Sequence, residues 1–439
     1  MKIASNFLWR YRKLDWLSSN TIYTDQWMFE NIPEYKPIVF NDEIVDLLVL
    51  KEEELTMKKY IDVNTDSLWE LDQIKWINEI IESENPIREI MALFWYFYFP
   101  TAKSIHRNID QEYINILRKN ALGSFRELII EVSNSGSMMY FLGSKYSSKE
   151  APNENFPREL FELYLLGIGN YSLGDVKEAS AALTGRRIGI VNSQTKYFID
   201  GEKLDNKKHN ILGEKEFFNL EGIVDVTLSK KAVSSFVVDK FMNFLFGQEF
   251  PNTITEQIAE EFRLSNYSNL TLIKSIIEHP FIRNNSVLWR SSVKGPVELL
   301  ICFSRQTGLK FKGLHTMDFL SKEFGQKLFS PPSVKGWPVG QDWLHNQWLL
   351  KRLVYLNGML EIANRTLLKE DLTYKIHSRL NLLKYRYIRH KCDAIWDKEH
   401  FYSTLGESGF TTQKWLIPGV DFNYDLNDCL SHPQYQFHL

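Results

Sequence analysis

Apolar residues recur every three or four positions along most of the chain, which is the period of an amphipathic α-helix. In the first regular segment, residues 66–83, the apolar positions are Leu68, Leu71, Ile74, Ile77 and Ile81. Asn85-Pro86 ends that helix. The next segment, PIREIMALFWYFYF, is apolar on nearly every side, so we expect a central, buried helix that begins at Pro86.

The same period predicts helices in residues 113–132, 176–183, 228–246, 254–262, 269–279 and 296–306, the first with a bend at Gly123. The pattern becomes alternating in RRIGIVNSQTKYFID, which indicates a β-hairpin. A Pro/Gly-rich loop follows at residues 329–342, and a long helix is expected from Trp343 to about Leu367. We therefore predict a mainly α fold, a single large helical domain with one small β-hairpin and a Pro/Gly-rich loop.

The segment PNENFPRELFELYLLGIGN, residues 152–170, carries charges within a mainly apolar helix expected over residues 156–166. At 100° per residue, Arg158, Glu159 and Glu162 form a narrow polar strip bordered by apolar residues. A narrow strip is typical of a partly buried face, and buried carboxylates need partners. Arg158 and Glu162 have the i, i+4 spacing of an ion pair.

Two interpretations of this strip stay open. Glu159 and Glu162 can form a catalytic acid/base pair in which burial raises the pKa of one carboxyl group. They can equally belong to a structural ion network around the neighbouring arginine. The asparagines before the helix can bind a ligand or simply cap the helix. The candidate binding residues of this segment are Asn153, Glu154, Asn155 and Arg158.

Composition and charge exclude several classes of protein. The chain has 439 residues, of which 44% are hydrophobic and 14% aromatic, enough for a sizeable core. The net charge is −3 without a basic stripe, which argues against a nucleic-acid-binding surface. Cys302, Cys392 and Cys429 are too far apart in the sequence for a zinc or redox motif. Without a signal-peptide pattern or a long apolar stretch, we expect a soluble, cytoplasmic protein with no membrane span.

Two further segments carry candidate chemistry. His209 and Lys215 fall in a predicted loop after the hairpin, where His209 can act as a catalytic acid or base and Lys215 can anchor an anion. They can also be plain exposed residues. Trp337, in the Pro/Gly-rich loop, and Gln326, beside it, are candidate binding residues, because such loops often line sites; Trp337 can also simply brace the core. The sequence contains no common nucleotide-binding, serine-hydrolase or zinc-protease motif.

Several motifs occur together and in order: NPIREIMALFW, LRKNALGSFREL, PNENFPRELFELYLLGIGNYSLGDVKEASAALTG, KKHNILGEK, SVKGPVELL and GQKLFSPPSVKGWPVGQDWL. As an ordered set they resemble the bacterial "domain of unknown function 1800" family of large, helix-rich proteins without an assigned activity. The resemblance implies a family core at residues 65–355. It leaves a weakly matching N-terminal region, residues 1–64, and a C-terminal helical extension packed on the core, residues 356–439.

The chain departs from the family pattern at positions with chemical meaning. Where the resemblance implies FWHNHF, the sequence reads FWYFYF, so Tyr96 and Tyr98 stand in place of two histidines. At His209-Asn210 an amide stands in place of the family's carboxylate. Two histidines and a His-Asp step would be a plausible set of metal ligands, for which tyrosine and asparagine are poor replacements. Either this chain has lost a metal site, or the family histidines are hydrogen-bonded core residues that tyrosine can replace.

The sequence supports two hypotheses about function. In the first, residues 153–162, the loop from His209 to Lys215 and the Trp337 loop converge on a polar pocket with a binding or accessory role, in an inactive relative of a metal-dependent enzyme. In the second, the protein is a hydrolase or transferase with Glu159, Glu162 and His209 as acid/base groups. No metal or other cofactor can be named. The expected partner is a small molecule or a protein, such as the sulfatase-like companion that the resemblance implies.

Overall fold

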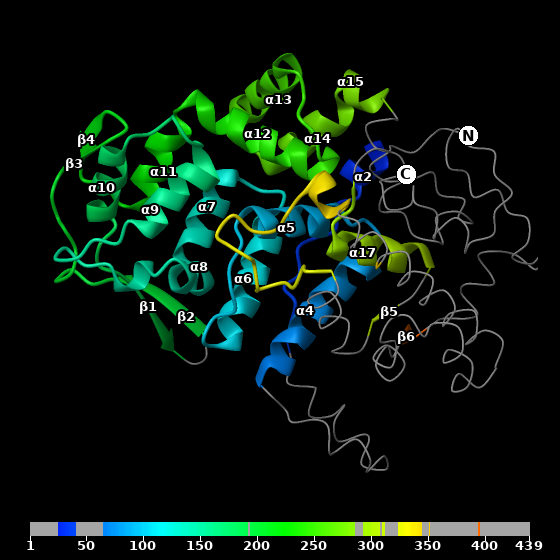
Figure 1. Ribbon diagram of the computed structural model, residues 1–439, viewed down its shortest axis with the longest axis horizontal. Coiled ribbons are helices and arrows are strands. Elements are labelled where there is room, and N and C mark those ends of the chain that lie inside the picture. The colour runs from blue at the N-terminus through cyan, green and yellow to red at the C-terminus, as the bar shows by residue number, and fades with distance from the viewer. Residues whose placement is uncertain are drawn as a thin grey trace, which may run out of the picture.

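The structure, a computed structural model, describes residues 25–40, 65–191, 194–285, 293–307, 310–311, 324–344, 351 and 394–395 (Figure 1). Most of the N-terminal region and nearly all of the predicted C-terminal extension lie outside these residues. The same holds for the predicted long helix beyond Leu344, apart from Lys351. The domain boundaries at residues 65 and 355 therefore stay predictions.

The described residues are mainly helical, as the hydrophobic pattern predicts. The first half contains α2 (Asp25–Glu30), α4 (Thr65–Glu82), α5 (Ile87–Tyr98), α6 (Arg107–Asn120), α7 (Phe125–Asn134), α8 (Gly136–Phe141), η2 (Ser144–Tyr146), α9 (Asn155–Glu159), η3 (Leu160–Leu165) and α10 (Leu173–Ala182). The second half contains α11 (Leu220–Leu228), α12 (Lys231–Phe246), α13 (Asn252–Leu264), α14 (Asn269–Glu278), α15 (Pro280–Arg283), α17 (Pro296–Thr307) and η4 (Gly340–Leu344). Among the helices described, none has the length and hydrophobicity needed to cross a membrane.

Local sequence signals set several helix boundaries. Pro86 precedes α5, and Gly123 separates α6 from α7 where the sequence predicts a bend. Ser124 caps α7 by accepting a hydrogen bond from the Glu127 N–H. At the start of α10, the Ser172 hydroxyl accepts from the Asp175 N–H and the Asp175 carboxylate accepts from the Ser172 N–H. These two reciprocal hydrogen bonds form a capping box.

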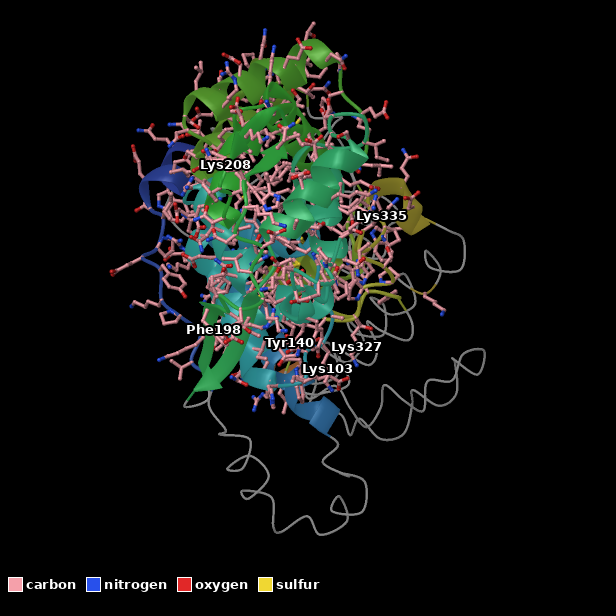
Figure 2. All side chains as sticks on the ribbon, turned by 90° about the vertical axis from the view of Figure 1, so that its left-hand side faces the viewer. Lys103, Tyr140, Phe198, Lys208, Lys327 and Lys335 are labelled. Carbon is pink, nitrogen blue, oxygen red and sulfur yellow. The ribbon has the colours of Figure 1, made fainter. Side chains whose placement is uncertain are left out.

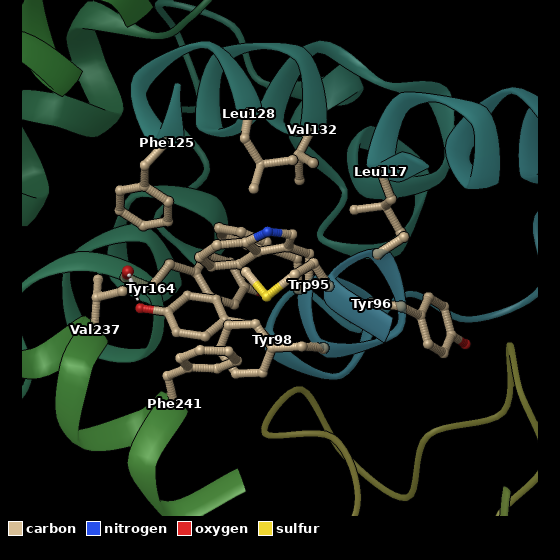
Figure 3. Packing of buried hydrophobic residues seen from close by; sticks show 14 of the residues in the cluster. Trp95, Tyr96, Tyr98, Leu117, Phe125, Leu128, Val132, Tyr164, Val237 and Phe241 are labelled. Carbon is tan, nitrogen blue, oxygen red and sulfur yellow. Dashed lines mark hydrogen bonds between the residues drawn. The ribbon is translucent and has the colours of Figure 1, made fainter. Parts of the chain in front are cut away.

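Helix α5 lies at the centre of the hydrophobic core and is buried along nearly its whole length, as predicted (Figure 3). Its Trp95 ring lies 5.3 Å from Phe125 of α7, and its Phe94 ring lies 4.2 Å from Phe241 of α12. The Trp95 indole N–H donates to the Ala121 carbonyl over 3.0 Å, so its polar atom is satisfied inside the core. Aromatic residues of α7 and α12 therefore pack directly against α5.

Within the described residues, three short antiparallel strand pairs accompany the helices. The predicted hairpin is present, with β1 (Arg186–Val191) paired to β2 (Gln194–Ile199) in register from Arg186↔Ile199 to Val191↔Gln194. The loop predicted from His209 to Lys215 is instead a second hairpin, β3 (His209–Ile211) with β4 (Glu214–Glu216). A third pair joins β5 (Lys310–Phe311) to β6 (Ala394–Ile395). The prediction of one hairpin is thus too low, because strands of two or three residues are too short to produce an alternating pattern.

The segment after Pro152 is helical, but the prediction of one α-helix is wrong for its second half. After α9 the chain continues as a π-helix, η3. The Leu166 N–H donates to the Phe161 carbonyl, five residues back, over 2.8 Å, and the Gly167 N–H donates to the same carbonyl over 3.0 Å. The wider turn changes which side chains share a face, so the polar strip deduced from 100° per residue does not hold beyond Glu159.

The Pro/Gly-rich loop lies across α5 (yellow in Figure 1). The Phe329 N–H donates to the Tyr96 hydroxyl, and the Trp337 ring lies 5.6 Å from the rings of Tyr96 and Phe97. The end of α12 and the start of η4 touch through Gly247 and Gly340, both with positive φ. A Cβ on Gly340 would lie only 2.5 Å from the Gly247 Cα, so this contact requires two glycines.

Candidate functional site

A cavity of about 180 Å³ lies where α5, α12, the start of α17 and the Pro/Gly-rich loop meet. Its walls are mainly aromatic, although these residues come from segments far apart in the sequence. The aromatic lining residues are Phe94, Phe97, Tyr98, Phe244, Trp337 and Trp343. The polar lining residues are Lys240, Asn243, Glu298, Gln326 and Lys335. Pockets with apolar walls and a few convergent polar groups are the usual sites of small-ligand binding.

Lys240, on α12, is a partly buried lysine in this cavity. Its Nζ donates to the Leu163 carbonyl over 2.5 Å and lies 4.6 Å from the centre of the Tyr98 ring. Burial lowers the pKa of the Lys240 amine to about 8. Among the described residues no carboxylate pairs with this amine, so nothing of opposite charge restores its pKa.

The π-helix provides the acceptor for Lys240. In an α-helix the Gly167 N–H would donate to the Leu163 carbonyl, but here it donates to Phe161 instead. The Leu163 carbonyl therefore accepts from Lys240, and the next carbonyl, that of Tyr164, accepts from the Tyr98 hydroxyl over 2.6 Å. Two side chains of the cavity thus replace backbone donors at the end of η3. Tyr98 and Tyr164, the residues of the second bond, lie side by side in Figure 3. π-Helical turns of this kind are frequent at functional sites.

The sequence candidates Gln326 and Trp337 both line the cavity. The Gln326 carbonyl oxygen accepts from the Val297 N–H over 2.8 Å, in the first turn of α17. Trp337 is buried, and its indole N–H has no hydrogen-bond partner within the described part of the chain. Lys335 extends from the same loop and is exposed (Figure 2). The loop therefore brings two polar groups to the cavity: the Lys335 cation and the Trp337 indole N–H, a hydrogen-bond donor without a partner among the described residues.

The charged residues of the opening segment pair differently from the prediction. Arg158 forms its ion pair with Glu154, at 2.7 Å, and the predicted pair of Arg158 with Glu162 is wrong. Both partners are more than a third exposed, so the pair contributes little to stability. Glu162 instead accepts from the Tyr171 hydroxyl over 2.9 Å. The π-helix explains the change, because it alters the angle between residues on either side of Leu160.

Glu159 is half-buried and lies between charges of both signs. Burial raises the pKa of its carboxyl group, and the neighbouring Glu162 carboxylate raises it further. Arg158 and Lys335 offset part of this shift. Since Lys335 also lines the cavity, Glu159 is electrostatically connected to the cavity although it does not line it.

Asn153 and Asn155 make local backbone contacts. The Asn153 side-chain oxygen accepts from the Asn155 N–H over 2.8 Å, and its amide nitrogen donates to the Gly143 carbonyl over 3.3 Å. Asn155 is exposed as the first residue of α9. These contacts order the entry to α9, although neither asparagine is its N-cap residue, which is Glu154 and has no side-chain capping hydrogen bond.

His209 and Lys215 lie on the second hairpin and do not line the cavity. His209 is buried, and its Nδ1 lies 3.0 Å from the Glu178 carboxylate of α10. Its Nε2 has no partner within the part of the chain that the structure describes. Lys215 is exposed. The three segments expected to converge therefore do so only in part: the Trp337 loop forms the cavity, residues 154–162 approach it, and the second hairpin stays with α10.

Tyr96 and Tyr98, at the positions where the family resemblance implies histidines, both make hydrogen bonds in the core. Tyr96 accepts from the Phe329 N–H, which fixes the start of the Pro/Gly-rich loop, and Tyr98 donates to the Tyr164 carbonyl. Both are fully buried, and burial raises their pKa values well above the ordinary range. In the residues described, no three His, Cys, Asp or Glu side chains gather closely enough to hold a metal ion. These contacts agree with the interpretation that tyrosine serves here as a hydrogen-bonded core residue.

Sequence reasoning missed Lys240. Its signal is present in SFVVDKFMNFLF, where Lys240 lies four residues from both Phe236 and Phe244 and so shares a helix face with them. A lysine on an aromatic face indicates a buried amine or a side chain that reaches the surface along its stem. The contacts of Lys240 with Leu163 and Tyr98 show that its amine is buried. The sequence pattern could not show this, because both residues are distant from Lys240 in the sequence.

Comparison with known proteins gives a family but no characterised relative. The sequence matches the family model described as "Protein of unknown function (DUF1800)" over residues 14–411. No curated protein and no solved structure matches the chain. The match extends beyond residues 65–355 at both ends, so the family similarity is broader than the motifs alone indicate. The membership predicted from those motifs is confirmed, and the chain belongs to the DUF1800 family of proteins of unknown function.

Proposed function

We propose that the protein binds a small, mostly apolar molecule in this cavity, with a polar group of the ligand facing Lys240. The proposal is carried by the combination of aromatic walls with a lysine that pairs with no carboxylate among the described residues. Aromatic side chains favour a flat apolar body, and a single polar group fixes its orientation. A binding or accessory role is also the first of the two functions that the sequence supports.

The cavity volume limits the size of the ligand. Pockets for drug-sized molecules enclose roughly 300–1,000 Å³, whereas an engineered apolar cavity of about 150 Å³ holds benzene. With a volume of about 180 Å³, the cavity fits one ring or a short chain with one polar substituent. Benzyl alcohol has this size and chemistry and is therefore a suitable probe.

Isothermal titration calorimetry with benzyl alcohol tests the proposal. We expect saturable one-to-one binding with a Kd of about 1 mM or tighter, equivalent to at least about 4 kcal/mol. Val339 lines the cavity and is 36% exposed, so Val339→Trp should close the mouth and weaken binding at least about tenfold. Leu264→Trp, at a 72% exposed position on α13, is the matched control and should bind like the wild type. Absence of binding, or equal binding in Val339→Trp, would refute the proposal.

The second candidate function is a hydrolase or transferase in which Glu159 acts as an acid or base. It is favoured by the raised pKa of the Glu159 carboxyl group and by the nearby Glu162 and Lys335. For this function, Glu159→Gln should abolish hydrolysis of a model ester such as p-nitrophenyl acetate, without changing the binding of benzyl alcohol. If wild type and variant both show only the background rate, the acid/base role of Glu159 in ester hydrolysis is rejected.

Several finer expectations stay predictions. These are the catalytic role of His209, descent from a metal-dependent enzyme, a cytoplasmic location and a sulfatase-like partner. The binding role does not depend on any of them, because it rests on residues of this chain that line the cavity.

A further inference from the structure

We propose that the Lys240 amine is a nucleophile that forms a Schiff base with an aldehyde or ketone ligand in the aromatic cavity. This inference rests on the proposed binding function and names its ligand class. It would give the protein a covalent, reversible mode of capturing small carbonyl compounds. The supporting observations are the position of Nζ, the surrounding charges and the shape of the cavity.

The position of Nζ suits attack on a bound carbonyl group. Lys240 lines the cavity, and its Nζ is held by one hydrogen bond to the Leu163 carbonyl. A neutral amine that donates one hydrogen there keeps its lone pair directed away from that carbonyl oxygen. The Tyr98 and Phe236 rings lie 4.6 and 5.0 Å from Nζ and exclude water from two sides. The amine is therefore oriented as well as buried.

The charges around Lys240 keep its neutral form accessible. Two other side chains that are charged at neutral pH line the cavity, Glu298 and Lys335, and neither shifts the pKa of Lys240, which burial alone lowers to about 8. An amine with this pKa is unprotonated in roughly one molecule in ten at pH 7, against fewer than one in a thousand for an ordinary lysine. Desolvated lysines of this kind are the ones that form Schiff bases in proteins.

The covalent step needs no reagent beyond the ligand. The Nζ lone pair attacks the carbonyl carbon, a C–N bond forms, and the electrons of the C=O π bond move to oxygen. A proton passes from nitrogen to that oxygen and gives a carbinolamine. The remaining N–H proton then leaves with the hydroxyl group as water, while the nitrogen lone pair forms the C=N bond. One water molecule is released, and hydrolysis reverses the reaction.

Trapping with benzaldehyde tests the inference. The full chain is incubated at pH 7 with benzaldehyde and sodium cyanoborohydride, and the benzylated lysines are located by peptide mass spectrometry. We expect Lys240 to be modified at least about tenfold faster than Lys335, at the cavity, and Lys231, exposed on the same helix. Benzyl alcohol should slow the modification of Lys240 alone, because it competes for the cavity.

Two variants keep the result interpretable. In Lys240→Arg, which retains the charge, the fast labelling phase should disappear, while Lys231→Arg should retain it; both are checked for a wild-type melting transition. Labelling spread over exposed lysines, with Lys240 modified no faster, would overturn the inference. If benzyl alcohol still binds in that case, the binding function stands and only the Schiff base is rejected. If it does not bind, both proposals are rejected together.

Discussion

Lys240 and Glu159 have pKa values shifted in opposite directions by the same cause. Burial disfavours the charged form of any group, so it lowers the pKa of the amine and raises that of the carboxyl group. Lys335 lies between the two sites, since it lines the cavity and lowers the pKa of Glu159. At neutral pH both residues are thus closer to their neutral forms than exposed residues of the same type.

Glu159→Gln should raise the free energy of unfolding at pH 7. The folded protein raises the pKa of Glu159, so ionising this residue costs more in the folded state than in the unfolded chain. The gain should stay below about 1 kcal/mol, because solvent screens a half-exposed carboxylate. It should shrink as the pH falls through the raised pKa toward 4, where the wild-type residue is itself protonated. Urea denaturation at several pH values measures this.

The control for Glu159 is Glu256→Gln, at an exposed position on α13, which should change stability by less than about 0.5 kcal/mol. A loss of several kcal/mol in Glu159→Gln would instead assign the residue to a structural ion network. That outcome would restore the other interpretation of the polar strip.

The reactivity of Lys240 should follow its lowered pKa. The rate of its acetylation by acetic anhydride, measured by peptide mapping, should rise with pH and level off at about pH 9, because an amine with a pKa of about 8 is half deprotonated at pH 8 and largely deprotonated one unit above it. A rate that continues to rise to about pH 10, as for an ordinary lysine, would contradict the burial of this amine.

The π-helix η3 depends on donors from other elements. Its last carbonyls accept from Tyr98 and Lys240, which are 66 and 77 residues away from their acceptors. Without these donors, buried carbonyl groups would be unsatisfied and the segment would gain by returning to an α-helix. The π-helix and the cavity therefore form together.

Tyr98→Phe should lower the free energy of unfolding by about 1–3 kcal/mol, because it leaves the buried Tyr164 carbonyl without its donor. Tyr140→Phe is the control, since the structure gives the Tyr140 hydroxyl no hydrogen bond within the described residues; its effect should be near zero. Urea denaturation measures both. Equal effects of the two substitutions would show that the Tyr98 hydroxyl does not support η3.

The contact between α12 and η4 predicts that alanine is more destabilising at Gly340 than at another glycine with positive φ. Gly340→Ala places a side chain at positive φ and against the Gly247 backbone, whereas Gly169→Ala meets a positive φ with nothing within 4 Å. The conformational penalty is common to both, so Gly340→Ala should be more destabilising by about 1–3 kcal/mol from overlap alone. Thermal unfolding of the two variants measures the difference, and similar melting temperatures would contradict the close contact.

Helix boundaries can be predicted from the sequence where one residue ends or caps the helix through its own backbone or a nearby side chain. Pro86, Gly123 and the Ser172–Asp175 pair each mark a boundary through backbone geometry or a side-chain cap within a few residues. The π-helix was not predictable, because six residues cannot distinguish its period from that of an α-helix. Its hydrogen-bond partners also come from other elements, which the local pattern does not include.

The cavity is a property of the whole chain. Trp337 and Gln326 could be proposed from the composition of their loop, but Lys240 looked like one more lysine in a helix. His209 was predicted to join the same pocket because histidine can act as an acid or base. Its strand instead packs on α10, where the His209 ring contacts the Glu178 carboxylate. Sequence patterns identify chemically able residues; only the packing of α5, α12 and the Pro/Gly-rich loop decides which of them meet.

A crystal structure of the protein grown with benzyl alcohol tests the ligand site most directly. We predict one probe molecule in the cavity, with its ring among Tyr98, Phe244 and Trp337 and its hydroxyl group within hydrogen-bond distance of Lys240 Nζ. A cavity closed by its own side chains, or a probe bound only elsewhere, would contradict the assignment of this cavity as the functional site.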